Sequence, residues 1–124
     1  MGTYTELVLK CRIKAGCPEL VHQVLNFMFG DSPFERPETL PHHKFFKSER
    51  WESVGRGCSY YHIPVCLSFY DGKHLFSRSD LKNYHGEIDL FIDWLKPYIS
   101  NETGQFIGWI FCENSREPIF IYSD

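Results

Sequence analysis

Hydrophobic and polar residues alternate with a period of two over residues 4–14. The odd positions from 7 to 13 are apolar, and the other positions carry charges at Glu6, Lys10, Arg12 and Lys14. Period two with one charged side predicts a half-buried β-strand. Its row of cations is either ordinary solvent-exposed surface or one wall of a ligand or partner surface.

Two segments repeat apolar residues every three or four positions, which is the spacing of one helix face. The first helix is expected to begin after Pro18 and to end at Gly30. The second is expected to begin after Gly86. Because Pro97 falls inside its pattern, this helix should end or kink near Lys96.

Further strands are expected on either side of the second helix. Residues 58–63 and 65–70 have strand character and are interrupted by Pro64. The pair Asp71-Gly72 predicts a hairpin turn that leads into a strand at 73–76. Beyond this hairpin, Ser79 and Asp80 suit a local cap or turn, and two aromatic-rich strands follow the second helix at 106–112 and 119–122.

The order of elements is therefore strand, helix, two strands, helix, two strands. It predicts an α+β fold of the β-α-β-β-α-β type with one strand added at the C-terminal end. The two helices should cover one face of a mostly antiparallel sheet, within a single domain over residues 1–124. Residues 31–57 show no sustained periodicity, so we expect a long irregular loop, a kind of segment that is usually functional or mobile.

Composition narrows the classes of function. Hydrophobic residues make up 43% of the 124 residues and charged residues 23%, which excludes a disordered chain. Aromatic residues reach 17%, so some rings should remain partly exposed in so small a domain. The net charge is −3, with +1 on the first 62 residues and −4 on the remaining 62, so nucleic acid is the weaker candidate partner.

Motifs for catalysis, metals and membranes are not found in the sequence. None of the five cysteines forms a C-x-x-C pair, and none of the six histidines has metal-ligand spacing, so we expect no metal, no cofactor and reduced thiols. The chain has no P-loop, no dinucleotide-binding glycine motif and no signal peptide. Its apolar runs are too short to span a membrane, so the cytoplasm is the expected location.

The first candidate binding segment is the part of the loop between residues 44 and 57. Basic side chains alternate there with rings, as in protein-binding hot spots and nucleotide stacking sites. The alternative is that the rings hold the loop against the core while the charges face solvent. The residues assigned to binding are Lys44, Lys47, Arg50, Trp51 and Arg56.

The second candidate combines hydroxyl groups, an imidazole and cations that could meet at one end of the sheet. Its members are Tyr60, Tyr61, His62, Arg78, Ser79, Asp80 and Lys82. The alternative is that these residues have only a local structural role, with the tyrosines on two sheet faces and Ser79 and Asp80 capping a turn. If the site were catalytic, His62 with Asp80 would suit a small phosphoester hydrolase.

Several longer motifs resemble a family of small uncharacterised proteins encoded by phages and prophages. The resemblance covers nearly the whole chain, on the segments Thr3–Lys10, Leu40–His42 with Phe45 and Phe46, Ser59–Pro64, Leu75–Tyr84, and Glu117 and Pro118 with Ile121 and Tyr122. It implies a phage or mobile-element origin and action in the cytoplasm of a bacterial host.

Together these points predict a non-enzymatic binding protein. As a phage protein it would inhibit a host defence system, either by blocking a host protein or by sequestering a small phosphate-bearing signal molecule. A pocket for such a ligand could form within the chain or at a homodimer interface. The phosphoester hydrolase using His62 and Asp80 is the alternative.

Overall fold

The computed structural model describes residues 3–31, 34–57 and 66–124. Within these residues five strands form one sheet in the order β2-β3-β1-β4-β5, and each neighbouring pair is antiparallel. The strands are β1 (Thr5–Arg12), β2 (Leu67–Tyr70), β3 (His74–Leu81), β4 (Phe106–Cys112) and β5 (Ile119–Tyr122).

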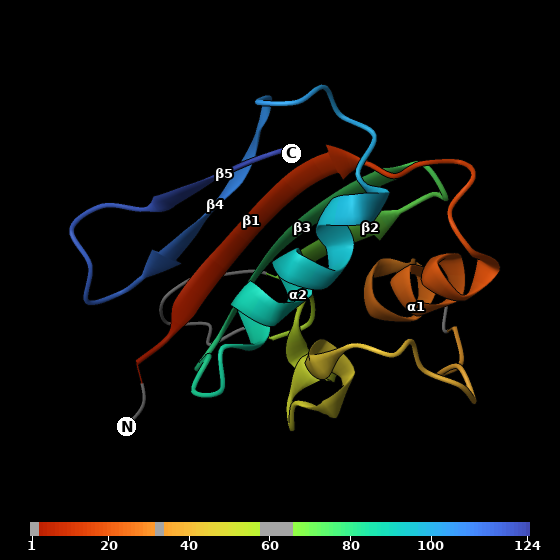
Figure 1. The fold of residues 1–124 in the computed structure, drawn as a ribbon. Helices are drawn as coiled ribbons and strands as arrows, with labels where there is room; N and C mark the ends of the chain where they lie inside the picture. The colour runs from red at the N-terminus through yellow and green to blue at the C-terminus, as the bar shows by residue number, and fades with distance from the viewer. Residues whose placement is uncertain (1–2, 32–33, 58–65) are drawn as a thin grey trace.

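Two α-helices lie against one face of this sheet, as Figure 1 shows. They are α1 (Glu19–Phe29) and α2 (Glu87–Leu95), and α2 continues into a short 3-10 helix, η3 (Lys96–Tyr98). The change of helix type occurs where Pro97 cannot donate a backbone hydrogen bond, as predicted. The expected α+β class, with both helices on one face and an added C-terminal strand, is confirmed.

The strand order is that of a split β-α-β arrangement, because β1 lies between β3 and β4. The alternation of β1 follows from this central position. Leu7 and Leu9 are fully buried under the helices, whereas Lys10 and Arg12 point to the opposite face and are exposed. A one-residue slip would expose the leucines, so burial fixes the register of the strand.

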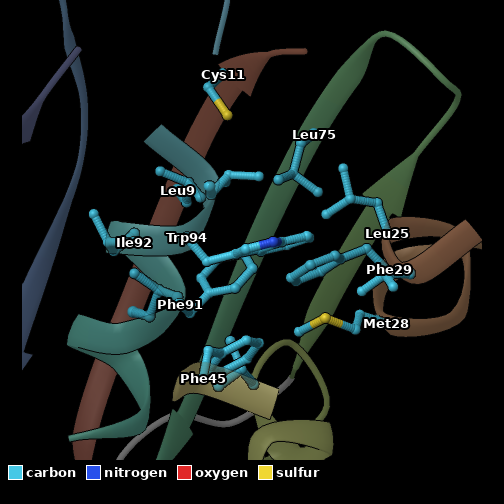
Figure 2. Packing of buried hydrophobic residues seen from close by; sticks show 14 of the residues in the cluster. Leu9, Cys11, Leu25, Met28, Phe29, Phe45, Leu75, Phe91, Ile92 and Trp94 are labelled. Carbon is cyan, nitrogen blue, oxygen red and sulfur yellow. The ribbon is translucent and has the colours of Figure 1, made fainter. Parts of the chain in front are cut away.

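The core fills the space between the sheet and the helices (Figure 2). Phe29 of α1 and Phe91 of α2 are fully buried, with ring centroids 5.5 Å apart. Phe45, from the long segment before β2, reaches the same place and lies 5.4 Å from the ring of Phe91. The described part of the segment between α1 and β2 therefore contributes to the core together with the helices.

That segment contains two short 3-10 helices, η1 (Lys44–Lys47) and η2 (Trp51–Ser53). The side chain of His43 accepts a hydrogen bond from the backbone N–H of Phe45 at 3.0 Å, which caps η1. Both helices are too short to show a periodicity in the sequence. The strand predicted at 58–63 lies outside the described residues.

The prediction of a cap or turn at Ser79 and Asp80 is wrong. Strand β3 continues through both residues to Leu81. The hydroxyl of Ser79 accepts a hydrogen bond from the backbone N–H of Gly55 at 3.1 Å, and the N–H of Asp80 donates to the carbonyl of Gly57 at 3.0 Å. The backbone of the loop thus pairs with this end of β3, and that pairing overrides the local turn preference of Ser and Asp.

Candidate functional site

The face of the sheet opposite α1 and α2, the open face, is hollowed across its centre. The hollow has a volume of about 860 Å³ and is formed mainly by β1, β3 and β4, with one end closed by residues between α2 and β4. Its polar and aromatic lining consists of Lys10, Arg12, His74, Phe76, Arg78, Asn101, Gln105, Phe106 and Trp109.

A β-bulge in β4 brings two rings of this hollow onto the same face. Residues three apart normally point to opposite faces of a strand. Between Phe106 and Gly108 the register with β5 shifts, so Ile107 is an extra residue in β4. The rings of Phe106 and Trp109 consequently lie nearly parallel, with 8° between their planes and 6.5 Å between their centroids.

The exposed part of this aromatic surface extends onto β5. Phe106 is 48% exposed, and its ring makes edge contacts with Phe120 at 5.6 Å and Tyr122 at 5.9 Å between centroids. Phe120 and Tyr122 are themselves about half exposed. Single exposed rings are common, but a contiguous group of exposed rings on one face is typical of an interaction site.

A nearly buried carboxylate holds two side chains of the hollow in position. One carboxylate oxygen of Glu6, on β1, accepts a hydrogen bond from the indole N–H of Trp109 at 3.1 Å. Its other oxygen accepts from Nε of Arg78, on β3, at 3.3 Å. The indole and the guanidinium are therefore ordered before any ligand arrives, which lowers the entropy cost of binding.

Lys10 and Arg12 give the hollow its free positive charge. Both side chains are exposed, and neither forms an ion pair within the part of the chain that the structure describes. The backbone N–H of Arg12 donates to Oδ1 of Asn101 at 2.7 Å, and Nδ2 of Asn101 donates to Oε1 of Gln105 at 3.2 Å. Two side-chain amides thus lie at the same end of the hollow as Arg12.

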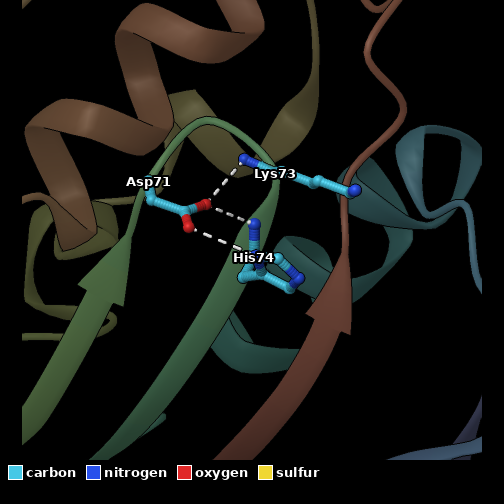
Figure 3. A network of polar contacts seen from close by, with 3 residues as sticks. All are labelled: Asp71, Lys73 and His74. Atoms are coloured by element: carbon cyan, nitrogen blue, oxygen red, sulfur yellow. Dashed lines mark hydrogen bonds and ion pairs between the residues drawn. The ribbon is translucent and has the colours of Figure 1, made fainter.

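His74 is held at the edge of the hollow by the turn between β2 and β3 (Figure 3). One carboxylate oxygen of Asp71 accepts from the backbone N–H groups of His74 at 2.6 Å and Lys73 at 2.9 Å. Its other oxygen lies 3.2 Å from Nδ1 of His74. These hydrogen bonds lower the pKa of Asp71 to about 2, and the one donated by the His74 backbone N–H has the largest effect. The carboxylate is ionised at neutral pH, so the hydrogen bonds that hold the turn are present there.

The predicted loop residues lie on the helix side of the molecule, away from the open face. Lys44 and Lys47 line a smaller hollow of about 370 Å³ beside α2, together with Glu49 and His85. Nε2 of His85 lies 3.6 Å from Oε2 of Glu49, so a carboxylate lines this hollow together with the two lysines. An anion would meet less net positive charge in this hollow than beside Lys10 and Arg12.

Two of the three remaining cations assigned to binding, Arg56 and Lys82, lie against aromatic rings. Arg50 faces solvent. The guanidinium of Arg56 covers the ring of Phe27 at 4.5 Å and donates to its backbone carbonyl. Nζ of Lys82 lies 6.0 Å from the rings of Tyr4 and Tyr84. Of the cations that the sequence assigned to the two candidate binding sites, Arg78 alone lines the hollow of the open face.

Three residues that the sequence assigned to binding are buried instead. Trp51 is 4% exposed, Asp80 is 1% exposed and Ser79 is fully buried. Trp51 packs edge-on against Phe46 at 5.1 Å between ring centroids, because its large apolar surface is more stable in the core than in water. Their assignment to a binding surface is therefore corrected.

The second predicted cluster is described only in part. Tyr60, Tyr61 and His62 lie outside the described residues, and so does the predicted pairing of His62 with Asp80. Of the described members, Arg78 faces the hollow, whereas Ser79 and Asp80 are buried where the loop meets β3.

One thiol lies beside the hollow of the open face. The thiol of Cys11, which is 4% exposed, borders it, and burial raises its pKa to about 12. In residues 3–31, 34–57 and 66–124, no three His, Cys, Asp or Glu side chains gather as metal ligands. No helix of these same segments is long and apolar enough to cross a membrane.

Most residues of the open-face hollow were not identified from the sequence. The row containing Lys10 and Arg12 was left open between ordinary solvent-exposed surface and one wall of a ligand or partner surface, and the strands at 106–112 and 119–122 were recognised as rich in rings. Their aromatic composition was the available signal. The bulge that joins Phe106 to Trp109, and the approach of Asn101 to β1, depend on pairings between distant segments.

Comparisons with protein-family models, with curated protein sequences and with solved structures found no match to this chain.

Proposed function

We propose that this chain is a non-catalytic binding protein whose open face takes a small ligand carrying a planar ring and a phosphate. One observation carries the proposal: the parallel rings of Phe106 and Trp109 share a hollow with the exposed cations Lys10 and Arg12. Stacking on aromatic side chains contributes roughly 1–3 kcal/mol per base. Lysine and arginine bind phosphate through charge-assisted hydrogen bonds.

The size and the polar lining of the hollow also suit a nucleotide. Small-molecule sites commonly measure roughly 300–1,000 Å³, and the open-face hollow measures about 860 Å³. The amides of Asn101 and Gln105 offer both donors and acceptors to the edge of a ring. Arg78 and Trp109 are already held by Glu6, so little ordering is needed on binding.

Sequestration is the mode of action that we infer for such a site. A protein that binds a signal nucleotide without converting it lowers the free concentration of that signal. The resemblance to phage proteins supports a role as an inhibitor of a host defence system that depends on such a signal. The expected ligand is thus a nucleotide of the bacterial host, bound and released unchanged.

The experiment is a titration of the protein with a panel of nucleotides, including AMP, ATP, cyclic mononucleotides and cyclic dinucleotides. Binding is followed by calorimetry and by quenching of tryptophan fluorescence. We expect saturable binding of at least one member, with about 5- to 150-fold weaker affinity after Phe106→Ala, the range that stacking implies. Arg12→Ala should weaken binding about 10-fold or more, because a hydrogen bond to a charged group is lost.

Lys44→Ala is the matched control, because this lysine is exposed and lies on the helix side of the molecule. It should bind as the unmodified protein does. The proposal is refuted if no member of the panel binds, or if Phe106→Ala and Arg12→Ala, both folded, bind with unchanged affinity. Turnover of the bound nucleotide would instead support the phosphoester hydrolase.

A further inference from the structure

Three side chains form a hydrogen-bonded chain on the helix side, remote from the open face. Sγ of Cys17 lies 3.2 Å from Nε2 of His22. Nδ1 of the same imidazole lies 2.5 Å from the hydroxyl of Tyr70. Cys17 immediately precedes the N-terminal residues of α1, His22 lies within α1, and Tyr70 ends β2. A thiol, an imidazole and a group that orients the imidazole are thus assembled from separate elements.

The two contacts allow a proton placement in which His22 can act as a base toward the thiol. For the thiol to donate to Nε2 of His22, the ring proton must reside on Nδ1 and be donated to the oxygen of Tyr70. The imidazole is then a neutral base whose free lone pair faces the thiol. A nucleophile within hydrogen-bond reach of a base, with the base oriented by a third group, is the arrangement that activates cysteine and serine nucleophiles.

Accessibility distinguishes Cys17 from the buried Cys11. Cys17 and His22 are partly exposed, whereas Tyr70 is 5% exposed and fixes the imidazole from the inside. The rings of His22 and Tyr70 also stack, with 23° between their planes. The imidazole is therefore held in one orientation, and Cys17 beside it is partly exposed.

The charges around Cys17 and His22 explain why the thiol needs the imidazole as a base. The titratable groups that face it are Glu19 on α1, Tyr70 and Asp71 at the end of β2, and Cys11 on β1. Burial, and then the charge of Glu19, raise the pKa of Cys17, while its own backbone N–H lowers it. A free thiolate is therefore scarce at neutral pH, and reaction requires transfer of the proton to His22.

We propose that Cys17 is a nucleophilic thiol that undergoes exchange with small disulfides, with His22 as the base. The sulfur of Cys17 attacks one sulfur of the disulfide, and its proton moves to Nε2 of His22. A new S–S bond forms, the S–S bond of the small disulfide breaks, and the departing thiolate takes the proton from His22. The products are a mixed disulfide on Cys17 and one free small thiol, so electrons and atoms balance.

The test is reaction of the folded protein with oxidised glutathione at neutral pH, with the modified cysteines identified by peptide mass spectrometry. We expect Cys17 to acquire glutathione at least 10-fold faster than Cys112, which is also partly exposed but has no imidazole contact among the described residues. Cys11 should remain unmodified because it is buried. The rate at Cys112 serves as an internal control in each sample.

Two variants separate base assistance from mere exposure. His22→Gln should slow reaction at Cys17 about 10-fold or more at neutral pH. At a pH above the pKa of the thiol, the reaction rates of the variant and the unmodified protein should become equal. Tyr70→Phe keeps the ring and removes the hydroxyl, so it should shift the pH profile of the rate at Cys17 with no change at Cys112. The inference is overturned if Cys17 reacts no faster than Cys112, or if folded His22→Gln reacts at the original rate throughout.

Discussion

Two tryptophans illustrate how differently one residue type is used in this molecule. Trp51 is 4% exposed and packs against Phe45 and Phe46 with ring centroids 6.0 and 5.1 Å away. Trp109 is partly exposed on the open face, and Glu6 accepts its indole hydrogen bond. The first ring stabilises the fold by burial, whereas the second is fixed in place with part of its surface accessible to a ligand.

Substitution of Trp51 tests its place in the core. Trp51→Ala should lower the free energy of unfolding by about 3–5 kcal/mol, the usual cost of removing a buried large aromatic side chain. The neighbouring exposed Arg50 is the control, and Arg50→Ala should change it by no more than about 0.5 kcal/mol. Urea denaturation measures both values. Equal stability of the two variants would contradict the burial of Trp51.

At the scale of elements, the binding face depends on a close approach between β1 and β4. Gly108 opposes Leu9 in this pairing, and a Cβ added to it would lie 2.0 Å from the backbone carbonyl oxygen of Val8. No side chain fits at that distance without separating the strands. The same residue follows the bulge at Ile107, which brings the rings of Phe106 and Trp109 together.

Gly108→Ala should therefore destabilise the protein by about 1–3 kcal/mol, as overpacking of a tight site does. It should also weaken nucleotide binding, because the shift of β4 moves the paired rings. Gly16→Ala is the control, since an added Cβ there meets no atom within 4 Å. Thermal unfolding monitored by circular dichroism compares the two, and a Gly108→Ala variant as stable as Gly16→Ala would refute this account.

At the scale of the whole molecule, one core joins the sheet, both helices and the segment between α1 and β2. Phe45 contacts Trp51 from its own segment and Phe91 and Trp94 from α2, with ring centroids between 5.4 and 6.2 Å apart. The loop end pairs with β3 through the hydrogen bond from the Asp80 N–H to Gly57. This segment was expected to be functional or mobile. Its described part between residues 44 and 57 instead packs into the core and is part of the structural framework.

A single cooperative unfolding transition should follow from this shared core. Tryptophan fluorescence reports on Trp51 and Trp94 in the core and on Trp109 of the open face, and far-UV circular dichroism reports on the helices and the sheet. The two signals should give the same denaturant midpoint. An earlier transition seen by fluorescence alone would contradict a single cooperative core.

The amino-acid sequence by itself determined which segments form strands and which form α-helices. For most of these elements it also determined which side is buried. The alternation in β1 sends Leu7 and Leu9 to the core and Lys10 and Arg12 to the open face, because side chains of a strand alternate whatever its neighbours are. The helix periodicities and the Asp71-Gly72 hairpin are equally local, so they could be recognised without the fold.

The tertiary structure decided which of these features meet. Whether a loop ring such as Trp51 faces solvent or the core depends on the cavity that α2 and the sheet leave open, which no local pattern records. The bulge at Ile107 lies in the pairing of β4 with β5, where β4 has one residue more than its partner. The contacts of Asn101 with β1, and of Cys17 with His22 and Tyr70, arise where separate elements pack together. The ligand-binding face and the reactive thiol that we propose both depend on such distant contacts, whose energies are set by packing rather than by sequence periodicity.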